Sequence, residues 1–142
     1  MRISAKTQYA CIAMSELAAG FPQGEPVRIR AIADEHNIPQ KFLVQILLQL
    51  KAAGLVNSTR GAAGGYQLSR PPSNVSLAEI ISAVCPSEVC PSGEDADSKV
   101  ADALTVIWSE VAAAEQELLA GITLADVLDR AKEAAADPMY YI

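Results

Sequence analysis

The sequence predicts a mainly α-helical chain that carries one small β-hairpin. Three observations support this fold class. Two helical segments, the second strongly amphipathic, are separated by a turn that ends at Pro39; a glycine-rich stretch, RGAAGGYQLSR at 60–70, follows them; and a long apolar seam lies nearer the C-terminus. This order of elements is that of a winged helix-turn-helix, here followed by a long dimerisation helix.

The first two helices are predicted from apolar periodicity. One covers about 4–19 and ends at Gly20, which we expect to be its C-cap. After the turn-rich stretch FPQGEPV, a short helix covers about 29–36. We expect this helix to end before Pro39, because a proline disfavours helical geometry in the residue before it. Pro39 is also well placed in the first turn of the next helix, where its missing N–H group costs nothing.

The next helix, over about 39–53, has two contrasting faces. Its apolar stripe consists of Phe42, Leu43, Ile46, Leu47 and Leu50. Its polar face offers Gln40, Lys41, Gln45, Gln49 and Lys51. The spacing predicts an amphipathic helix that packs its stripe on a core, ends at Gly54, and exposes a face that can enter a DNA major groove.

Two short extended segments, 55–59 and 66–69, form the predicted hairpin. The glycines between them that we expect close to DNA are Gly61, Gly64 and Gly65. They supply the backbone freedom that a tight connection needs and let the backbone approach a ligand closely. Arg60 is presented at the tip of the hairpin, where it can enter a minor groove.

Charge is distributed unevenly along the chain. The net charge is −6, but residues 1–72 hold eight Lys and Arg against four acidic residues, a net +4, which leaves −10 for the rest. A basic face for nucleic acid is therefore expected in the N-terminal part. The candidate DNA contacts are Arg2, Lys6, Arg30, Gln40, Lys41, Val44, Gln45, Arg60, Gly61, Gly64 and Gly65. Arg2 and Lys6 are expected at phosphates, which position a protein without specifying sequence.

The composition excludes several classes of protein. With a single His and no Ser-His-Asp set, P-loop or metal-ligand spacing, the chain has no catalytic set, so we do not expect an enzyme. It has neither a run of about 18 apolar residues nor a signal-peptide pattern, so we expect a cytoplasmic protein that does not span a membrane. Three cysteines in such a chain argue against a structural disulfide framework.

The C-terminal half begins with a capping box formed by Ser76 and Glu79, which starts a short helix through Val84. The loop CPSEVCPSGEDADS, at 85–98, comes next. It carries two cysteines, two prolines, one glycine and four acidic residues, a composition that is typical of a loop.

A long helix over about 99–119 and a last helix, opened by Thr123 with Asp126, complete the predicted fold. The seam of the long helix, spaced alternately by four and three, consists of Val100, Leu104, Ile107, Val111, Ala114 and Leu118. This spacing is that of a coiled coil, so the seam is expected at a dimer interface. The predicted organisation is a winged helix-turn-helix DNA-binding domain at 1–72, a short helix and cysteine loop at 73–98, the dimerisation and final helices at 99–130, and a tail at 131–142.

Four stretches in this order resemble the Rrf-two family of bacterial transcription regulators, which includes IscR, NsrR and CymR. They are MRISAKTQYA at the start, the helix-turn-helix stretch ending in LKAAGLV, the wing RGAAGGYQLSRPP, and SLAEIISAV. The resemblance covers residues 1 to about 130 and implies a homodimer that binds double-stranded DNA at a palindromic operator. In the family an acidic residue often stands where this chain has Val44, which can offer only an apolar contact, for instance to a thymine methyl group.

The resemblance also draws attention to the cysteine loop. Family members that hold an iron–sulfur cluster use three loop cysteines and a fourth ligand. Here Cys85 and Cys90 match the first two, and Asp95-Ala96-Asp97 stands where the third is expected, so the ligand set is incomplete. The pair could be completed by a second subunit or a carboxylate, could form a reversible disulfide, or could be a relic with no sensing role.

The sequence therefore predicts a DNA-binding transcription regulator, a homodimeric repressor that responds to redox state, iron or nitric oxide. The alternative is a winged-helix module that binds other proteins and has no sensing role. The positive charge of residues 1–72 favours DNA binding over this alternative.

Overall fold

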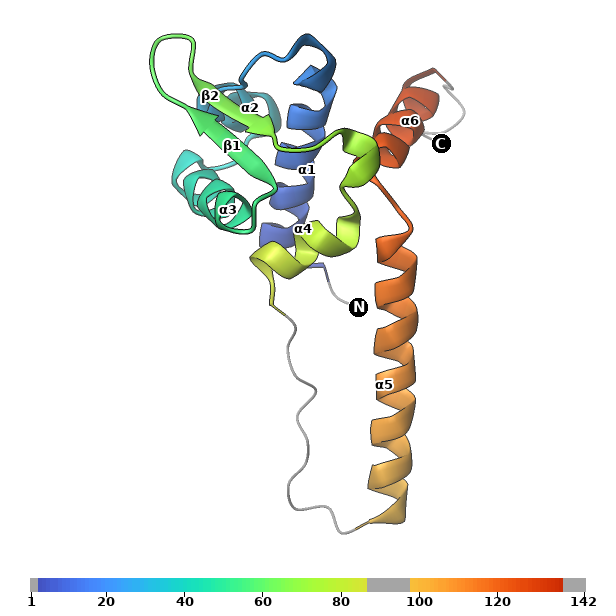
Figure 1. The fold of residues 1–142 in the computed structure, drawn as a ribbon. Helices are drawn as coiled ribbons and strands as arrows, with labels where there is room; N and C mark the ends of the chain where they lie inside the picture. Colours follow the sequence, from blue (N-terminus) through green and yellow to red (C-terminus); the bar gives the residue numbers. More distant parts are fainter. Residues whose placement is uncertain (1–2, 87–97, 137–142) are drawn as a thin grey trace.

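A computed structural model describes residues 3–86 and 98–136 of the chain. Within these ranges the chain forms six α-helices, two short 3-10 helices and one antiparallel pair of strands (Figure 1). In chain order the elements are α1 (Ala5–Gly20), η1 (Phe21–Gln23), α2 (Ile29–His36), α3 (Gln40–Ala52), β1 (Val56–Thr59), β2 (Gly65–Leu68), η2 (Pro72–Asn74), α4 (Leu77–Val84), α5 (Lys99–Ala120) and α6 (Leu124–Ala136). The winged helix-turn-helix arrangement predicted from the sequence is confirmed.

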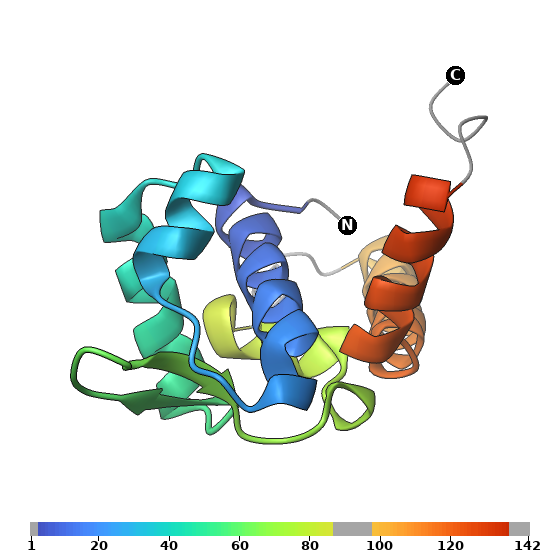
Figure 2. The same ribbon diagram turned by 90° about the horizontal axis from the view of Figure 1, so that it is seen from above.

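Helix α1 is the centre of the fold, with α3, α4, α6 and β2 packed around it (Figure 2). The N-cap of α1 is Ser4, whose side chain accepts a hydrogen bond from the backbone N–H of Thr7 at 3.1 Å. The helix includes Gly20, so the prediction that Gly20 is the C-cap is wrong. The chain instead continues into η1 and turns at Gly24, whose φ of 67° is the left-handed conformation that glycine adopts most easily.

The turn between α2 and α3 is built on Asn37 and Pro39. Asn37 ends α2 in the left-handed conformation, with φ of 53°, and Pro39 is the N-cap of α3 rather than its first helical residue. The core face of α3 is fully buried and consists of Leu43, Ile46, Leu47 and Leu50. Phe42, predicted to belong to this face, lies at its margin and is 41% exposed, with its ring 5.7 Å from that of Tyr9 in an edge-on arrangement.

The wing is the hairpin of β1 and β2, in the antiparallel register that pairs Val56 with Leu68 and Thr59 with Gly65. The second strand also pairs on its other edge, because the backbones of Val27 and Tyr66 exchange two hydrogen bonds of 2.8 Å. The first strand begins one residue later than the expected segment 55–59 and ends with it, and the second is shifted one residue towards the N-terminus from 66–69. The extra pairing anchors the end of β2 nearest the wing tip to the segment before α2.

Both predicted capping boxes are present. Ser76 and Glu79 exchange side-chain-to-backbone hydrogen bonds at the start of α4, and Thr123 and Asp126 do the same before α6. Leu124, the first residue of α6, is completely buried in the core. The last helix runs to Ala136, so the described part of the expected tail at 131–142 is helical.

Helix α5 differs from the rest of the fold. Its 22 residues extend away from the winged-helix body (Figure 1), a length of about 33 Å at 1.5 Å per residue. None of its residues is buried within the described chain. Among residues 3–86 and 98–136, no segment buries the apolar side chains of this long helix.

Candidate nucleic-acid interface

The face of α3 opposite the core is the centre of the candidate interface. Gln40, Lys41 and Gln45 are exposed on α3, and Val44 is half-buried. The burial of the opposite face fixes the rotation of the helix about its own axis, so these side chains point away from the body. Leu48 is also on this outward face and is 50% exposed. Leu48 is not among the residues predicted for this face, although its spacing of four from Val44 places the two side chains next to each other on the helix.

Two contacts fix α2 and α3 in place. His36, at the end of α2, pairs with Glu16 on α1 through its Nε2 atom, 2.8 Å from a carboxylate oxygen, and thereby joins the first helix of the turn motif to the core helix. Lys51 near the end of α3 donates a hydrogen bond of 2.6 Å to the hydroxyl of Ser58 on β1. This second contact links the outward-facing helix to the wing, and the sequence alone did not indicate it.

Arg60 directly follows β1 and is exposed, as expected for a residue at the tip of the wing. Gly61 is also exposed, with φ of 108°. Gly64 is buried, and a Cβ there would collide with the carbonyl oxygen of Thr59. A Cβ on Gly65 would lie 2.5 Å from the carbonyl oxygen of Val27. The tight turn of the wing therefore needs Gly64, and the approach of the wing to Val27 needs Gly65, and both reasons are independent of DNA.

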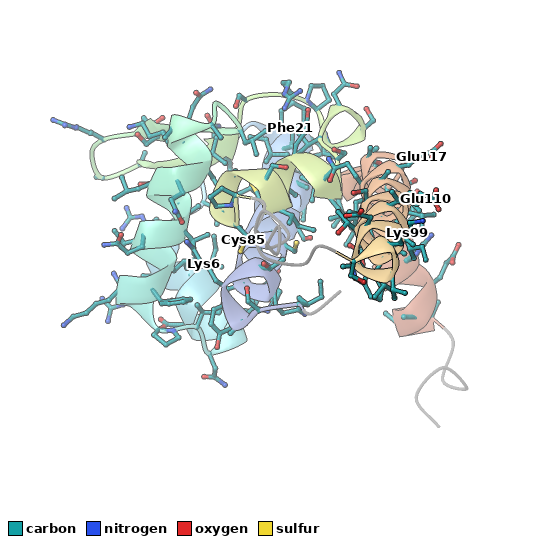
Figure 3. All side chains as sticks on the ribbon, turned by 90° about the horizontal axis from the view of Figure 1, so that it is seen from below. Lys6, Phe21, Cys85, Lys99, Glu110 and Glu117 are labelled. Atoms are coloured by element: carbon teal, nitrogen blue, oxygen red, sulfur yellow. The ribbon has the colours of Figure 1, made fainter. Side chains whose placement is uncertain are left out.

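The other predicted cationic contacts come from the N-terminal part of the chain. Lys6 is half-buried near the start of α1 (Figure 3), and Arg30 is exposed on the first turn of α2. Arg30 lies 3.9 Å from Asp34, one turn later, a surface pair of little energetic weight that leaves the guanidinium available. Arg2 lies outside the described residues. Their contacts with DNA stay predictions.

Cys85 lies at the junction of the loop and the body. It is the C-cap of α4, beside the start of α1 (Figure 3). Its sulfur is 3.2 Å from the hydroxyl of Thr7 and 3.8 Å from that of Ser4, the N-cap of α1. Any chemical change at this sulfur would therefore act on the first turn of the core helix.

Cys90, with Asp95 and Asp97, lies outside the described residues. Cys11 is half-buried on α1, and burial raises the pKa of its thiol, which makes it less reactive. Among the described residues, the one group with three clustered metal-capable side chains is Glu16, Glu35 and His36 on α1 and α2, and it includes no cysteine.

The seam of α5 is exposed along its whole length. The exposed fractions run from 41% for Leu104 to 70% for Val100 and Leu118, with Ile107 and Val111 between these values. Side chains of this size and kind, aligned on one face of a helix, form the type of apolar surface that marks a protein–protein contact. The structure therefore places the predicted interface residues on one available surface.

Comparison with known proteins identifies the family. Residues 3–130 match the Rrf2 family, described as iron-dependent transcriptional regulators. CymR of Bacillus subtilis, an HTH-type transcriptional regulator, is 32% identical over 146 residues, which cover all of both chains. The family and this relative are transcriptional regulators and not enzymes, which confirms the prediction from the sequence that the chain is not an enzyme.

Solved structures agree with this match. T. potens IscR superposes with a TM-score of 0.80 at 36% identity, covering 99% of this chain and 97% of the other. The global cysteine regulator CymR of B. subtilis superposes with a TM-score of 0.75 at 33% identity, covering 92% of this chain and 98% of the other. In the described ranges, no helix is long and apolar enough to span a membrane. The chain belongs to the Rrf2 family of transcriptional regulators, the Rrf-two family that its sequence resembles.

Proposed function

We propose that this protein is a homodimeric repressor that binds a palindromic operator through α3 and the wing, and that Cys85 and Cys90 make its DNA binding responsive to redox state, iron or nitric oxide. Transcriptional regulators of this family bind DNA. The observation that carries the proposal is the outward face of α3, which projects polar and cationic side chains beside an exposed arginine at the wing.

The DNA-binding surface is assigned by docking geometry. In a winged helix-turn-helix the second helix of the turn enters the major groove. Here that helix is α3, and its outward amides and the Lys41 ammonium match the donors and acceptors of base edges and phosphates. Arg60 extends the surface towards an adjacent minor groove, whose negative potential attracts a guanidinium.

The homodimer is supported by α5. Its apolar seam has no cover within the described chain, and the alternating spacing of four and three suits a second copy of the same helix. A symmetric dimer built on this seam would present two α3 helices, and half-sites about one helical turn apart follow from that arrangement.

The sensing role is supported by the position of Cys85. Its sulfur contacts the N-terminal turn of α1, the helix on which the DNA-binding domain is assembled. Oxidation or ligation of the sulfur would remove its contact with the hydroxyl of Thr7. The loss would shift the DNA-binding domain between a conformation that binds the operator and one that does not. An iron–sulfur cluster needs four ligands, and the two loop cysteines do not complete that set within one chain.

DNA binding is tested by in vitro selection of a duplex from a random-sequence library, followed by retardation assays on the selected operator. Arg60→Ala should weaken binding by about 1–3 kcal/mol per site, the scale of a good specific contact. The control is Arg130→Ala, an exposed arginine on α6, which should bind as the wild type does. A wild type that selects no sequence would contradict the proposal and favour a protein-interaction module.

Sensing is tested with the cysteine variants. Protein purified without oxygen is examined for iron and for visible absorption, and its operator affinity is then measured with and without oxidant, iron and nitric oxide. We expect Cys85→Ala and Cys90→Ala each to abolish the response. Cys11→Ala, which removes a half-buried thiol, should retain the response. A double variant at Cys85 and Cys90 that responds like the wild type would make the loop a relic.

A further inference from the structure

Leu48 is a large apolar side chain in an unusual place. It is 50% exposed, whereas the leucines and isoleucine on the opposite face of α3 are completely buried. The described part of the chain packs several partly buried side chains against the core, and Leu48 is not one of them. Replacing Leu48 with Ala or with a polar residue would therefore remove no packing against the core, and the described fold gives no reason for a large apolar side chain at this position.

The neighbours of Leu48 indicate what would cover it. Val44 is one helical turn earlier and half-buried, so the two side chains form an apolar strip along the outward face. Gln45 and Lys41 lie on the same face and are exposed. An apolar strip beside an ammonium group and a carboxamide suits a surface that is negatively charged and polar yet carries isolated methyl groups.

We infer that Leu48, together with Val44, reads thymine methyl groups in the major groove, so that each operator half-site carries two thymines at fixed positions. The inference rests on the proposed DNA binding of α3. The 5-methyl group of thymine is the only apolar group that B-DNA presents at the floor of this groove. The charge of the flanking side chains favours DNA over an apolar protein partner.

Helix geometry sets the expected spacing of the two thymines. Residues four apart on a helix are separated by about 6 Å along its axis. B-DNA rises by about 3.4 Å per base pair, so two side chains at this spacing reach base pairs one or two steps apart. The order of the contacts follows the helix direction, with Val44 nearer the start of α3 and Leu48 nearer its end.

The test uses the selected duplex and replaces each thymine of one half-site, one at a time, with deoxyuridine, which lacks only the methyl group. At two positions, one or two steps apart, we expect wild-type affinity to fall about fourfold, the ratio that corresponds to about 0.8 kcal/mol for one buried methyl-sized group. In Leu48→Ala the penalty at one of these positions should disappear, and in Val44→Ala the penalty at the other. Combining each truncated side chain with each demethylated base makes a double-mutant cycle, which isolates the contact between that side chain and that methyl group.

The control is Val106→Ala, which trims an exposed apolar side chain on α5 away from the seam and should retain both penalties. If Leu48→Ala weakens binding equally on thymine and uracil duplexes, Leu48 contacts something other than the methyl group and the inference is wrong. If deoxyuridine has no effect while Arg60→Ala still weakens binding, the inference fails and the proposed function stands. If the wild type selects no duplex, both fail together.

Discussion

The winged-helix body and helix α5 treat their apolar side chains in opposite ways. In the body, the residues of α1, α3 and α4 that carry the helical periodicity are buried against one another within the same chain. In α5 the apolar side chains repeat just as regularly but are exposed to solvent, and none of the 22 residues of the helix is buried by the described part of the chain. Apolar side chains at helical spacing therefore indicate either a core or a contact with another molecule. Which of the two applies depends on whether other helices of the same chain pack against that face.

This difference matches the division of charge. Helices α1 to α3 and the wing belong to the part of the chain with net +4, whereas α5, with α4 and α6, lies in the part with −10. The DNA phosphate backbone is negatively charged, so it repels the carboxylates of the acidic part and attracts the Lys and Arg side chains of the basic part. With assembly proposed for α5 and DNA contact for α3 and the wing, a substitution in α5 should act on operator affinity only through loss of the dimer, and one on the outward face of α3 should leave the dimer intact.

The largest expected effect comes from placing a charge in the α5 seam. Ile107→Glu would bury an unpaired carboxylate in each copy of a dimer, at a cost of about 3–5 kcal/mol or more. We expect sedimentation to show a monomer whose body still unfolds cooperatively, and operator affinity should fall steeply because half-sites are no longer bound together. The control is Val106→Glu, on the other side of α5 and 58% exposed. A dimer that survives Ile107→Glu would show that the seam is not the interface.

A second substitution compares the two regions directly. Leu47→Ala removes a completely buried side chain of α3 and should lower the free energy of unfolding by about 2–5 kcal/mol. Leu104→Ala trims a side chain of the seam, so its cost should depend on protein concentration, as expected for a contact made between chains. Denaturant titrations at several protein concentrations separate the two. Equal, concentration-independent losses would contradict the division into a self-contained body and a dependent helix.

The sequence predicts local structure well where the deciding partners are close along the chain. The capping boxes at Ser76 and Thr123 depend on residues three apart, and both were found from spacing alone. The core stripe of α3 follows from periodicity, with the exception of Phe42. That residue lies at the edge of the stripe, and its exposure depends on where Tyr9 of another helix comes to rest.

The candidate site was predictable in part, for the same reason. Arg60 and the outward face of α3 were located from motif order, but three contacts were not. The approach of Cys85 to Thr7 joins residues far apart in sequence, and so do the pairing of His36 with Glu16 and the backbone contact of Gly65 with Val27. A short sequence window contains no signal for such contacts. Leu48 belongs to neither face predicted from the sequence, because a division of α3 into an apolar stripe and a polar face gives no role to an apolar side chain on the polar side.

A smaller effect is expected where the start of β2 meets Val27. Gly65→Ala places a Cβ against the Val27 carbonyl and in a backbone conformation, φ of 154°, that side chains disfavour. Strain of this kind costs about 1–3 kcal/mol. The cost should appear as faster hydrogen exchange at the amides of Val27 and Tyr66, which form the bridge. Gly61→Ala, at an open position with φ of 108°, is the matched control and should leave that exchange unchanged.

The smallest expected effect concerns the cap of α6 and depends on pH. The backbone N–H of Thr123 donates a hydrogen bond of 2.9 Å to the carboxylate of Asp126; this bond, with a lesser contribution from the Thr123 side chain, lowers the pKa of Asp126. A carboxyl whose pKa is lower in the folded state binds fewer protons there than in the unfolded chain, so it stabilises the fold above its ordinary pKa of about 3.9 and loses this effect as the pH falls through its folded-state pKa.

Asp126→Asn should therefore destabilise the protein near neutral pH, and the difference from the wild type should shrink as the solution is taken from about pH 7 to about pH 3. Denaturant titrations across this range measure it, with Asp129→Asn on the same helix but outside the capping box as the control. A difference that stayed constant with pH would show that the carboxylate charge has no part in the cap. Because α6 packs Leu124 into the core of the body, loosening of this cap should leave the dimer intact, in contrast to the seam substitution.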